Sequence, residues 1–71
     1  MNTYHVVSTY YPQGTFFCVI VFQCPDGRQR KWMGWDTLID DLCKKYRVKS
    51  LDGLDFPELP KNGGFVEDEG F

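Results

Sequence analysis

His5 is the only histidine in this 71-residue chain, and it is the first residue to consider for acid–base chemistry. It lies in a segment rich in Tyr, Val and Thr, a composition typical of a strand. General acid–base catalysis needs a histidine that a partner group tunes and orients, and the sequence pairs no nucleophile or carboxylate with this one. We therefore interpret His5 as a strand residue, and we expect no catalytic residues and no enzymatic activity.

Cys18, Cys24 and Cys43 could join His5 in a zinc site. Structural zinc sites usually offer two ligands that are two to four residues apart, whereas the nearest cysteines here are six apart. Those two cysteines also share one predicted strand, which separates them by about 20 Å, too far for a disulfide bond. The sequence therefore predicts reduced thiols, a cytoplasmic location, no metal and no cofactor.

Charge is divided along the chain. The segment from Arg28 to Lys49 carries seven basic and three acidic residues, whereas the segment from Leu51 to Phe71 carries six acidic residues and one basic residue. The net charge of −2 gives no global attraction to nucleic acid or to an anionic membrane. The longest apolar run, Phe16 to Phe22, is too short to cross a bilayer, and the N-terminus lacks the pattern of a signal peptide.

Three strands are predicted in the first half of the chain, over residues 3–11, 15–24 and 28–33. Turns separate them at Pro12-Gln13-Gly14 and at Pro25-Asp26-Gly27, the second of which has the composition of a tight hairpin. The second strand is apolar on both faces, which fits a central strand or a strand that keeps one face for a partner. The basic residues of the third strand predict that it forms an edge of the sheet.

Asp36 is the predicted N-cap of a helix that runs to Tyr46 or Val48. Its apolar residues follow helical spacing at Leu38, Ile39, Leu42, Cys43 and Tyr46. We therefore predict an α+β fold in which a small antiparallel three-stranded meander packs against one amphipathic helix. An irregular C-terminal strap over residues 51–59 completes a single domain of residues 1–61, and residues 62–71 form a flexible acidic-aromatic tail.

Aromatic and basic residues gather around the third predicted strand. The chain is 17% aromatic, more than the thin core of so small a protein can bury. Arg and Trp are enriched where interfaces gain most of their binding energy, and an acidic tail with phenylalanines can dock on a basic groove. The candidate partner-binding residues are Tyr10, Tyr11, Arg28, Arg30, Trp32, Trp35, Glu67, Asp68, Glu69 and Phe71.

The stretch from Gly14 to Tyr46 combines an apolar strand, Pro-Asp-Gly, an Arg-x-Arg-Lys-Trp strand and a helix that opens at Asp36-Thr37. This arrangement resembles the three-stranded-sheet-plus-helix domains of some phage integrases, whose sheet enters the major groove of DNA. The acidic tail departs from that pattern. In size, acidic balance and aromatic surface, the chain also resembles phage-encoded inhibitors of host enzymes, including anti-CRISPR and anti-restriction proteins.

The leading hypothesis is a non-enzymatic binding module that occupies a surface of a larger protein as an inhibitor or adaptor. Its expected partner is a nucleic-acid-handling enzyme with a basic groove, as for a phage anti-defence inhibitor. The first alternative is a nucleic-acid-binding module that uses the strand from Arg28 to Trp35, which the net charge disfavours. The second alternative is a structural homodimer that closes the spare apolar face of the second strand.

Overall fold

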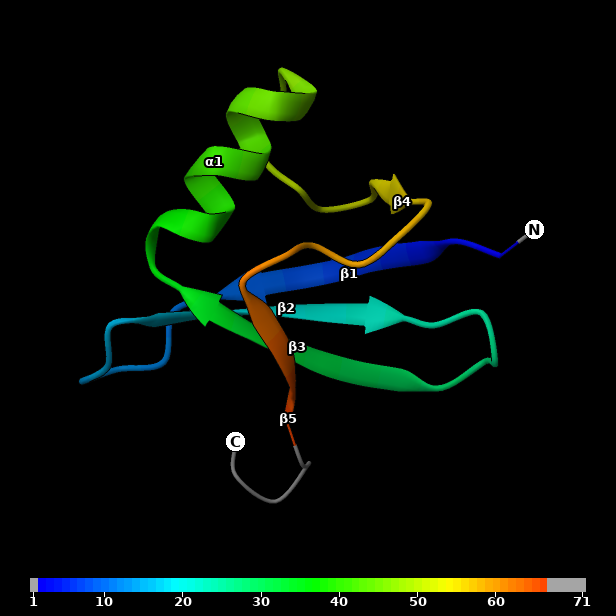
Figure 1. Cartoon of the computed structure of the whole chain (residues 1–71), viewed down its shortest axis with the longest axis horizontal. Coiled ribbons are helices and arrows are strands. Elements are labelled where there is room, and N and C mark those ends of the chain that lie inside the picture. The colour runs from blue at the N-terminus through cyan, green and yellow to red at the C-terminus, as the bar shows by residue number, and fades with distance from the viewer. Residues whose placement is uncertain (1, 67–71) are drawn as a thin grey trace.

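The computed structural model describes residues 2–66, which form an antiparallel sheet and one helix (Figure 1). In chain order the elements are β1 (Tyr4–Tyr10), β2 (Phe17–Gln23), β3 (Gln29–Trp35), α1 (Thr37–Tyr46), β4 (Asp55–Phe56) and β5 (Gly63–Val66). The order across the sheet is β4-β1-β2-β3-β5, so a meander of three consecutive strands occupies the centre. The predicted α+β class, with an antiparallel sheet and one helix, is confirmed for these residues.

The predicted number of strands was wrong, because residues 2–66 form a sheet of five strands instead of three. The first addition, β4, lies within the predicted strap and pairs with β1 through Tyr4 opposite Phe56. The second addition, β5, pairs with the outer side of β3, so β3 is not the edge of the sheet that its basic residues predicted. A two-residue strand is too short to show alternation, and glycines are depleted in strands, so neither element follows from local sequence.

The C-terminal segment that we predicted as a flexible tail begins at residue 62. Its residues Gly63–Val66 form β5, with Phe65 opposite Trp32. The remainder of that predicted tail, residues 67–71, lies outside the described residues. The predicted acidic tail therefore lies outside them as well.

The hairpin between β2 and β3 has the predicted turn. The Gly27 amide donates to the Cys24 carbonyl at 3.0 Å, and the Arg28 amide donates to the Asp26 side chain at 2.9 Å. Gly27 has a φ of 89°, a left-handed conformation that side chains with a β-carbon resist. Local turn chemistry therefore fixes the register of these two strands.

The helix α1 begins after Asp36, as predicted, but the Asp36 side chain makes no capping hydrogen bond. Its backbone already has helical angles, with φ −59° and ψ −25°, whereas a capping side chain acts from an extended residue. The Asp36 amide instead donates to the Phe16 carbonyl at 2.9 Å, which ties the start of the helix to the start of β2. At the other end, Arg47 adopts the left-handed conformation that closes many helices.

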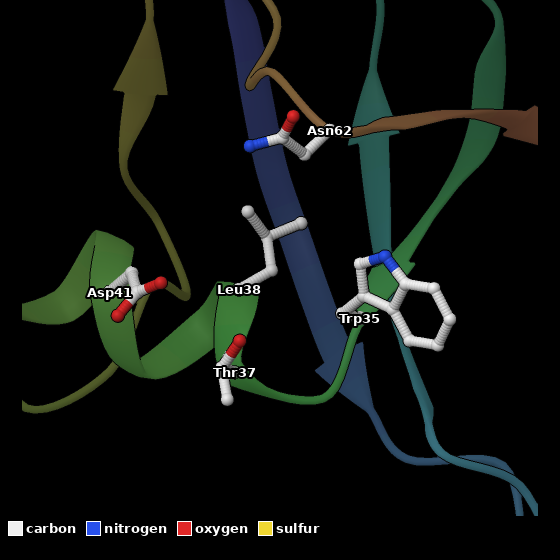
Figure 2. A pocket seen from close by; sticks show the side chains of 5 residues that line it. All are labelled: Trp35, Thr37, Leu38, Asp41 and Asn62. Atoms are coloured by element: carbon white, nitrogen blue, oxygen red, sulfur yellow. The ribbon is translucent and has the colours of Figure 1, made fainter.

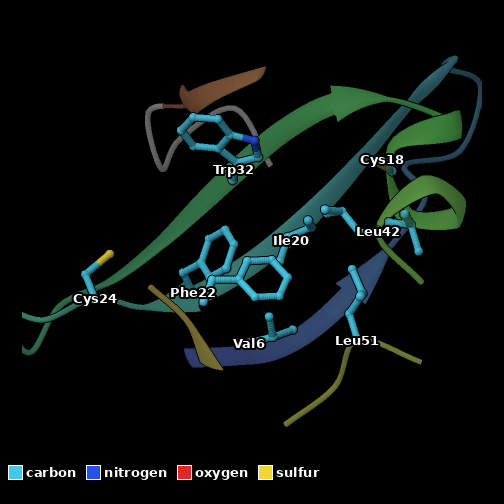
Figure 3. Packing of buried hydrophobic residues seen from close by; sticks show 10 residues of the cluster. Val6, Cys18, Ile20, Phe22, Cys24, Trp32, Leu42 and Leu51 are labelled. Atoms are coloured by element: carbon cyan, nitrogen blue, oxygen red, sulfur yellow. The ribbon is translucent and has the colours of Figure 1, made fainter. Parts of the chain in front are cut away.

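The main core lies between α1 and one face of the sheet (Figure 3). Alternate residues of β2 supply its centre, and α1, the segment after it and β4 cover them. Its buried members are Val6, Cys18, Ile20, Phe22, Cys24, Trp32, Ile39, Leu42, Leu51 and Phe56. The Phe56 ring stacks on Tyr46 with ring centres 5.0 Å apart, so β4 also anchors the end of the helix.

The opposite face of the sheet is also apolar. Pairing places Tyr10 and Met33 on either side of Val19, which is fully buried and yet outside the main core. A bulge in β1 sets Val7 and Ser8 together against Val21. We call this surface the second face; its apolar residues are Val7, Tyr10, Phe17, Val19, Val21, Met33, Trp35 and Val66, and Ser8 and Lys31 lie among them. Since α1, β4 and the strap pack on the core side, none of these elements covers it.

Candidate protein-binding surface

Three large aromatic side chains are exposed at one end of the sheet. Tyr11 follows β1, Phe16 precedes β2 and Trp35 ends β3, with exposed fractions of 54%, 76% and 60%. The register brings them to the same end, because Phe17 lies opposite Trp35 and Tyr10 lies opposite Val19. We call Tyr11, Phe16 and Trp35 the aromatic end.

The loop between β1 and β2 holds Phe16 in this position. The Thr15 hydroxyl donates to the Pro12 carbonyl at 2.8 Å and accepts from the Phe17 amide at 3.4 Å. The hydrogen bond from the Asp36 amide to the Phe16 carbonyl fixes the backbone from the other side. Phe16 lies before β2 begins, and its side chain projects from the end of the sheet.

Trp35 combines an ordered position with a free surface. Its indole stacks on the Phe17 ring, with ring centres 5.3 Å apart and planes at 29°. Its indole also borders a pocket of 290 Å³ between the start of α1 and the start of β5 (Figure 2). The pocket is lined by Trp35, Thr37, Leu38, Asp41 and Asn62. An aromatic ring that is held on one side and open on the other loses little conformational entropy on binding.

Carboxylates border the aromatic end. Asp36 lies beside Trp35 in the chain, and Asp40 stands one turn further along α1. Partial burial raises the pKa of the Tyr11 hydroxyl, and the negative charge of Asp40 raises that pKa further. This effect places Tyr11 within electrostatic reach of the helix carboxylates, so the apolar surface at this end has an acidic border.

Trp32 belongs to the core and not to the exposed surface, with only 8% of its side chain exposed. The Phe65 ring meets it edge-on at 5.1 Å, and the Arg30 guanidinium lies 3.9 Å above the same Phe65 ring. Among residues 2–66, the Trp32 indole nitrogen finds no hydrogen-bond partner. Trp32 thus anchors β5 to the sheet.

The predicted site residues are divided between two ends of the molecule. Tyr11 and Trp35 belong to the aromatic end and Tyr10 lies next to Tyr11 on the second face, whereas Arg28 and Arg30 lie near the β2–β3 turn. Five residues of extended strand separate Arg30 from Trp35, a distance of about 17 Å. Glu67, Asp68, Glu69 and Phe71 lie outside the described residues. Phe16 was missed as a candidate, although its place directly after a turn indicated that its side chain could escape the sheet.

No matching family model, similar curated protein or similar solved structure was found for this chain. Its function therefore has to be inferred from the chemistry of its own residues.

His5 acquires a partner that the sequence did not predict. Pairing of β4 with β1 brings the Asp55 carboxylate to 2.8 Å from the His5 ring nitrogen Nδ1. Both side chains are about half exposed, a setting in which an ion pair contributes little to stability. Within residues 2–66, Asp55 is the one hydrogen-bond partner of this imidazole, so no hydroxyl or thiol completes a catalytic arrangement.

The three cysteines carry free thiols. Burial raises the pKa of Cys18 and Cys24, so both favour the unreactive protonated form. The Cys18 thiol also donates to the Trp35 carbonyl at 3.1 Å, which supports the strand that carries the indole. Among residues 2–66, no cluster of His, Cys, Asp and Glu side chains could hold a metal ion. No helix in that range has the length and apolar character needed to cross a membrane.

Proposed function

We propose that this protein is a non-enzymatic binding module that docks its aromatic end on the surface of a larger protein, as an inhibitor or adaptor. The observation that carries the proposal is the joint exposure of Tyr11, Phe16 and Trp35 at one ordered end of the sheet. Scattered exposed apolar residues are ordinary on a protein surface, but three large aromatic side chains at one place are not.

The energetics of such a surface suit a small interface. Trp and Tyr are enriched among the few residues that provide most of the binding energy, and each can contribute about 2 kcal/mol or more. Trp35 is already held by its stack on Phe17, so its ordering cost is low. An aromatic centre with a polar border is the usual anatomy of a protein–protein interface.

Charge indicates the kind of partner. The carboxylates of Asp36 and Asp40 border the aromatic end, and they favour a basic surface on the partner. Enzymes that handle nucleic acid offer basic grooves, so a phage-type anti-defence inhibitor of the anti-CRISPR or anti-restriction kind is our favoured class. The acidic residues Glu67, Asp68 and Glu69 of the predicted tail would add to the same attraction.

The nucleic-acid-binding alternative relies on the strand from Arg28 to Trp35. Arg30 packs its guanidinium on the Phe65 ring, and Lys31 lies on the opposite face of β3 from it. The basic residues therefore do not form one continuous stripe on this strand, and the separation favours the protein-binding proposal.

Binding to a panel of purified CRISPR effector nucleases and restriction enzymes tests the proposal by calorimetry. We expect at least one enzyme to bind, and we expect Phe16→Ser or Tyr11→Ser to weaken that binding by about tenfold or more. The control variant, Arg28→Gln with Arg30→Gln, changes the opposite end of the sheet and should leave the affinity within about threefold. Tight binding to duplex DNA at physiological salt that is lost on Arg30→Ala would favour the nucleic-acid alternative instead.

A further inference from the structure

We infer that the second face of the sheet packs against the same face of a second copy of this chain, which gives a symmetric homodimer. This inference rests on residues in the middle of the sheet and not on Tyr11 or Phe16. The two surfaces share Trp35, so a dimer would cover that ring and leave Tyr11 and Phe16 for the partner of the proposed function.

The second face has the composition of an interface. Its centre is apolar, with Val19 fully buried between Tyr10 and Met33 and with Val21 next to it. Gln23 and Gln29 form a polar margin at one end of the strands, and Ser8 and Lys31 flank Val21 within the face. An apolar centre inside a polar margin distinguishes an interface from an ordinary solvent-facing side of a sheet, which alternates to polar residues.

The available area is sufficient for a weak dimer. The strands β1, β2 and β3 have seven residues and are about 23 Å long, and β5 has four residues and is about 13 Å long, which gives a projected area of about 400 Å² per copy. The relief of the side chains increases the accessible area, so two copies bury on the order of 1,000 Å², near the lower limit for a specific interface. We therefore expect dissociation in the micromolar range and not an obligate dimer.

Shape and charge select a second copy as the occupant. A twisted, pleated sheet is complemented best by another sheet, and two sheets pack with their strands within about 30° of each other. Lys31 and Asp55 are the charged residues that the register places on this face, with Asp55 at its β4 edge beside His5, so a second copy presents a charge of opposite sign to each of them.

Sedimentation velocity of the wild-type chain from about 1 µM to about 500 µM tests the inference. We expect the mass to rise from the monomer value of 8.3 kDa to twice that value. Val21→Lys should weaken dimerisation by about 100-fold or more, because it places an unpaired charge in each half of the interface. Val7→Lys should act in the same direction, and it is the variant safer for folding since Val7 is already 42% exposed.

The matched control is Phe16→Lys, which makes a comparable change on the aromatic end. This variant should dimerise as the wild type does, although it should lose the partner of the proposed function. The wild type remaining a monomer at the highest concentration would overturn the inference. So would a folded Val7→Lys or Val21→Lys variant that dimerises like the wild type. Neither result would affect the proposed function, which depends on Phe16 and Tyr11.

Discussion

Two adjacent glycines in β5 give a sharp test of the fifth strand. A β-carbon on Gly63 would lie 2.5 Å from the Trp32 indole nitrogen and 2.6 Å from the Met33 carbonyl oxygen. A β-carbon on Gly64 would meet no atom of the described residues within 4 Å, its two chain neighbours aside. We therefore expect Gly63→Ala to destabilise the fold and Gly64→Ala to leave it unchanged or slightly more stable, although both variants carry the same chemical change.

The magnitude follows from which atoms can move. The Met33 atom that the new β-carbon would approach is a backbone oxygen, which can move away only if β5 separates from β3. The Trp32 side chain cannot move away either, because it is buried in the core. Overpacking of this kind costs about 1–3 kcal/mol. Replacing glycine by alanine also restricts the unfolded chain and stabilises by about 0.4–1 kcal/mol where the backbone tolerates it, as it does at Gly64. The two variants should therefore differ by about 2 kcal/mol in the free energy of unfolding.

Thermal unfolding followed by circular dichroism can resolve this difference, because 1 kcal/mol shifts the midpoint of so small a domain by about 4–8 °C. Tryptophan fluorescence gives a second readout, since loss of β5 removes Phe65 from the Trp32 ring. Equal midpoints for the two variants, with the native fluorescence of Trp32 retained, would refute the placement of β5 beside β3.

Three further predictions concern the core, the turn and pH. Trp32→Ala should lower the free energy of unfolding by about 3–5 kcal/mol, whereas Trp35→Ala should lower it by less than about 1 kcal/mol, as measured by urea denaturation. Gly27→Val should cost about 1 kcal/mol or more in the same assay, because valine resists the φ of 89°. Burial raises the pKa of Cys18 and Cys24 above the ordinary 9.0, so the unfolded chain releases these protons first. The contribution of these two thiols to stability should therefore be fully present below about pH 8 and should be lost as the pH rises above about 9, and a free energy of unfolding that stays flat from about pH 8 to about pH 11 would contradict this reasoning.

The meander and the helix could be predicted from the sequence because their determinants are local. The Pro25-Asp26-Gly27 turn sets its own geometry, and the apolar stripe of α1 repeats at helical spacing. The strands β4 and β5 depend on distant partners instead. Gly63 pairs with Gly34. Because neither residue has a side chain, Gly63 leaves room for Trp32 and Gly34 leaves room for Leu38. No pattern within Asn62-Gly63-Gly64 indicates that a tryptophan thirty residues earlier will lie there.

The candidate site was predictable only in part, for a related reason. Trp32 and Trp35 are three residues apart on one strand, so alternation alone places them on opposite faces. Alternation does not indicate which face the helix will cover, because both faces of β2 are apolar. The main core determines that outcome by burying Trp32 with Ile39 and Leu42, and this leaves Trp35 exposed.

The two proposed surfaces reinforce each other if both exist. One helix can cover only one face of the sheet. The uncovered second face is apolar and therefore favours a second copy, whatever partner the aromatic end binds. A symmetric dimer would carry two aromatic ends, each with Tyr11 and Phe16 still exposed and Trp35 shared with the dimer contact. A partner that offers two equivalent sites would then be bound through both, with an avidity about 10²-fold or more above the affinity of one end. Val7→Lys should remove this gain while Phe16→Ser removes binding at each end, so the two variants together separate avidity from intrinsic affinity.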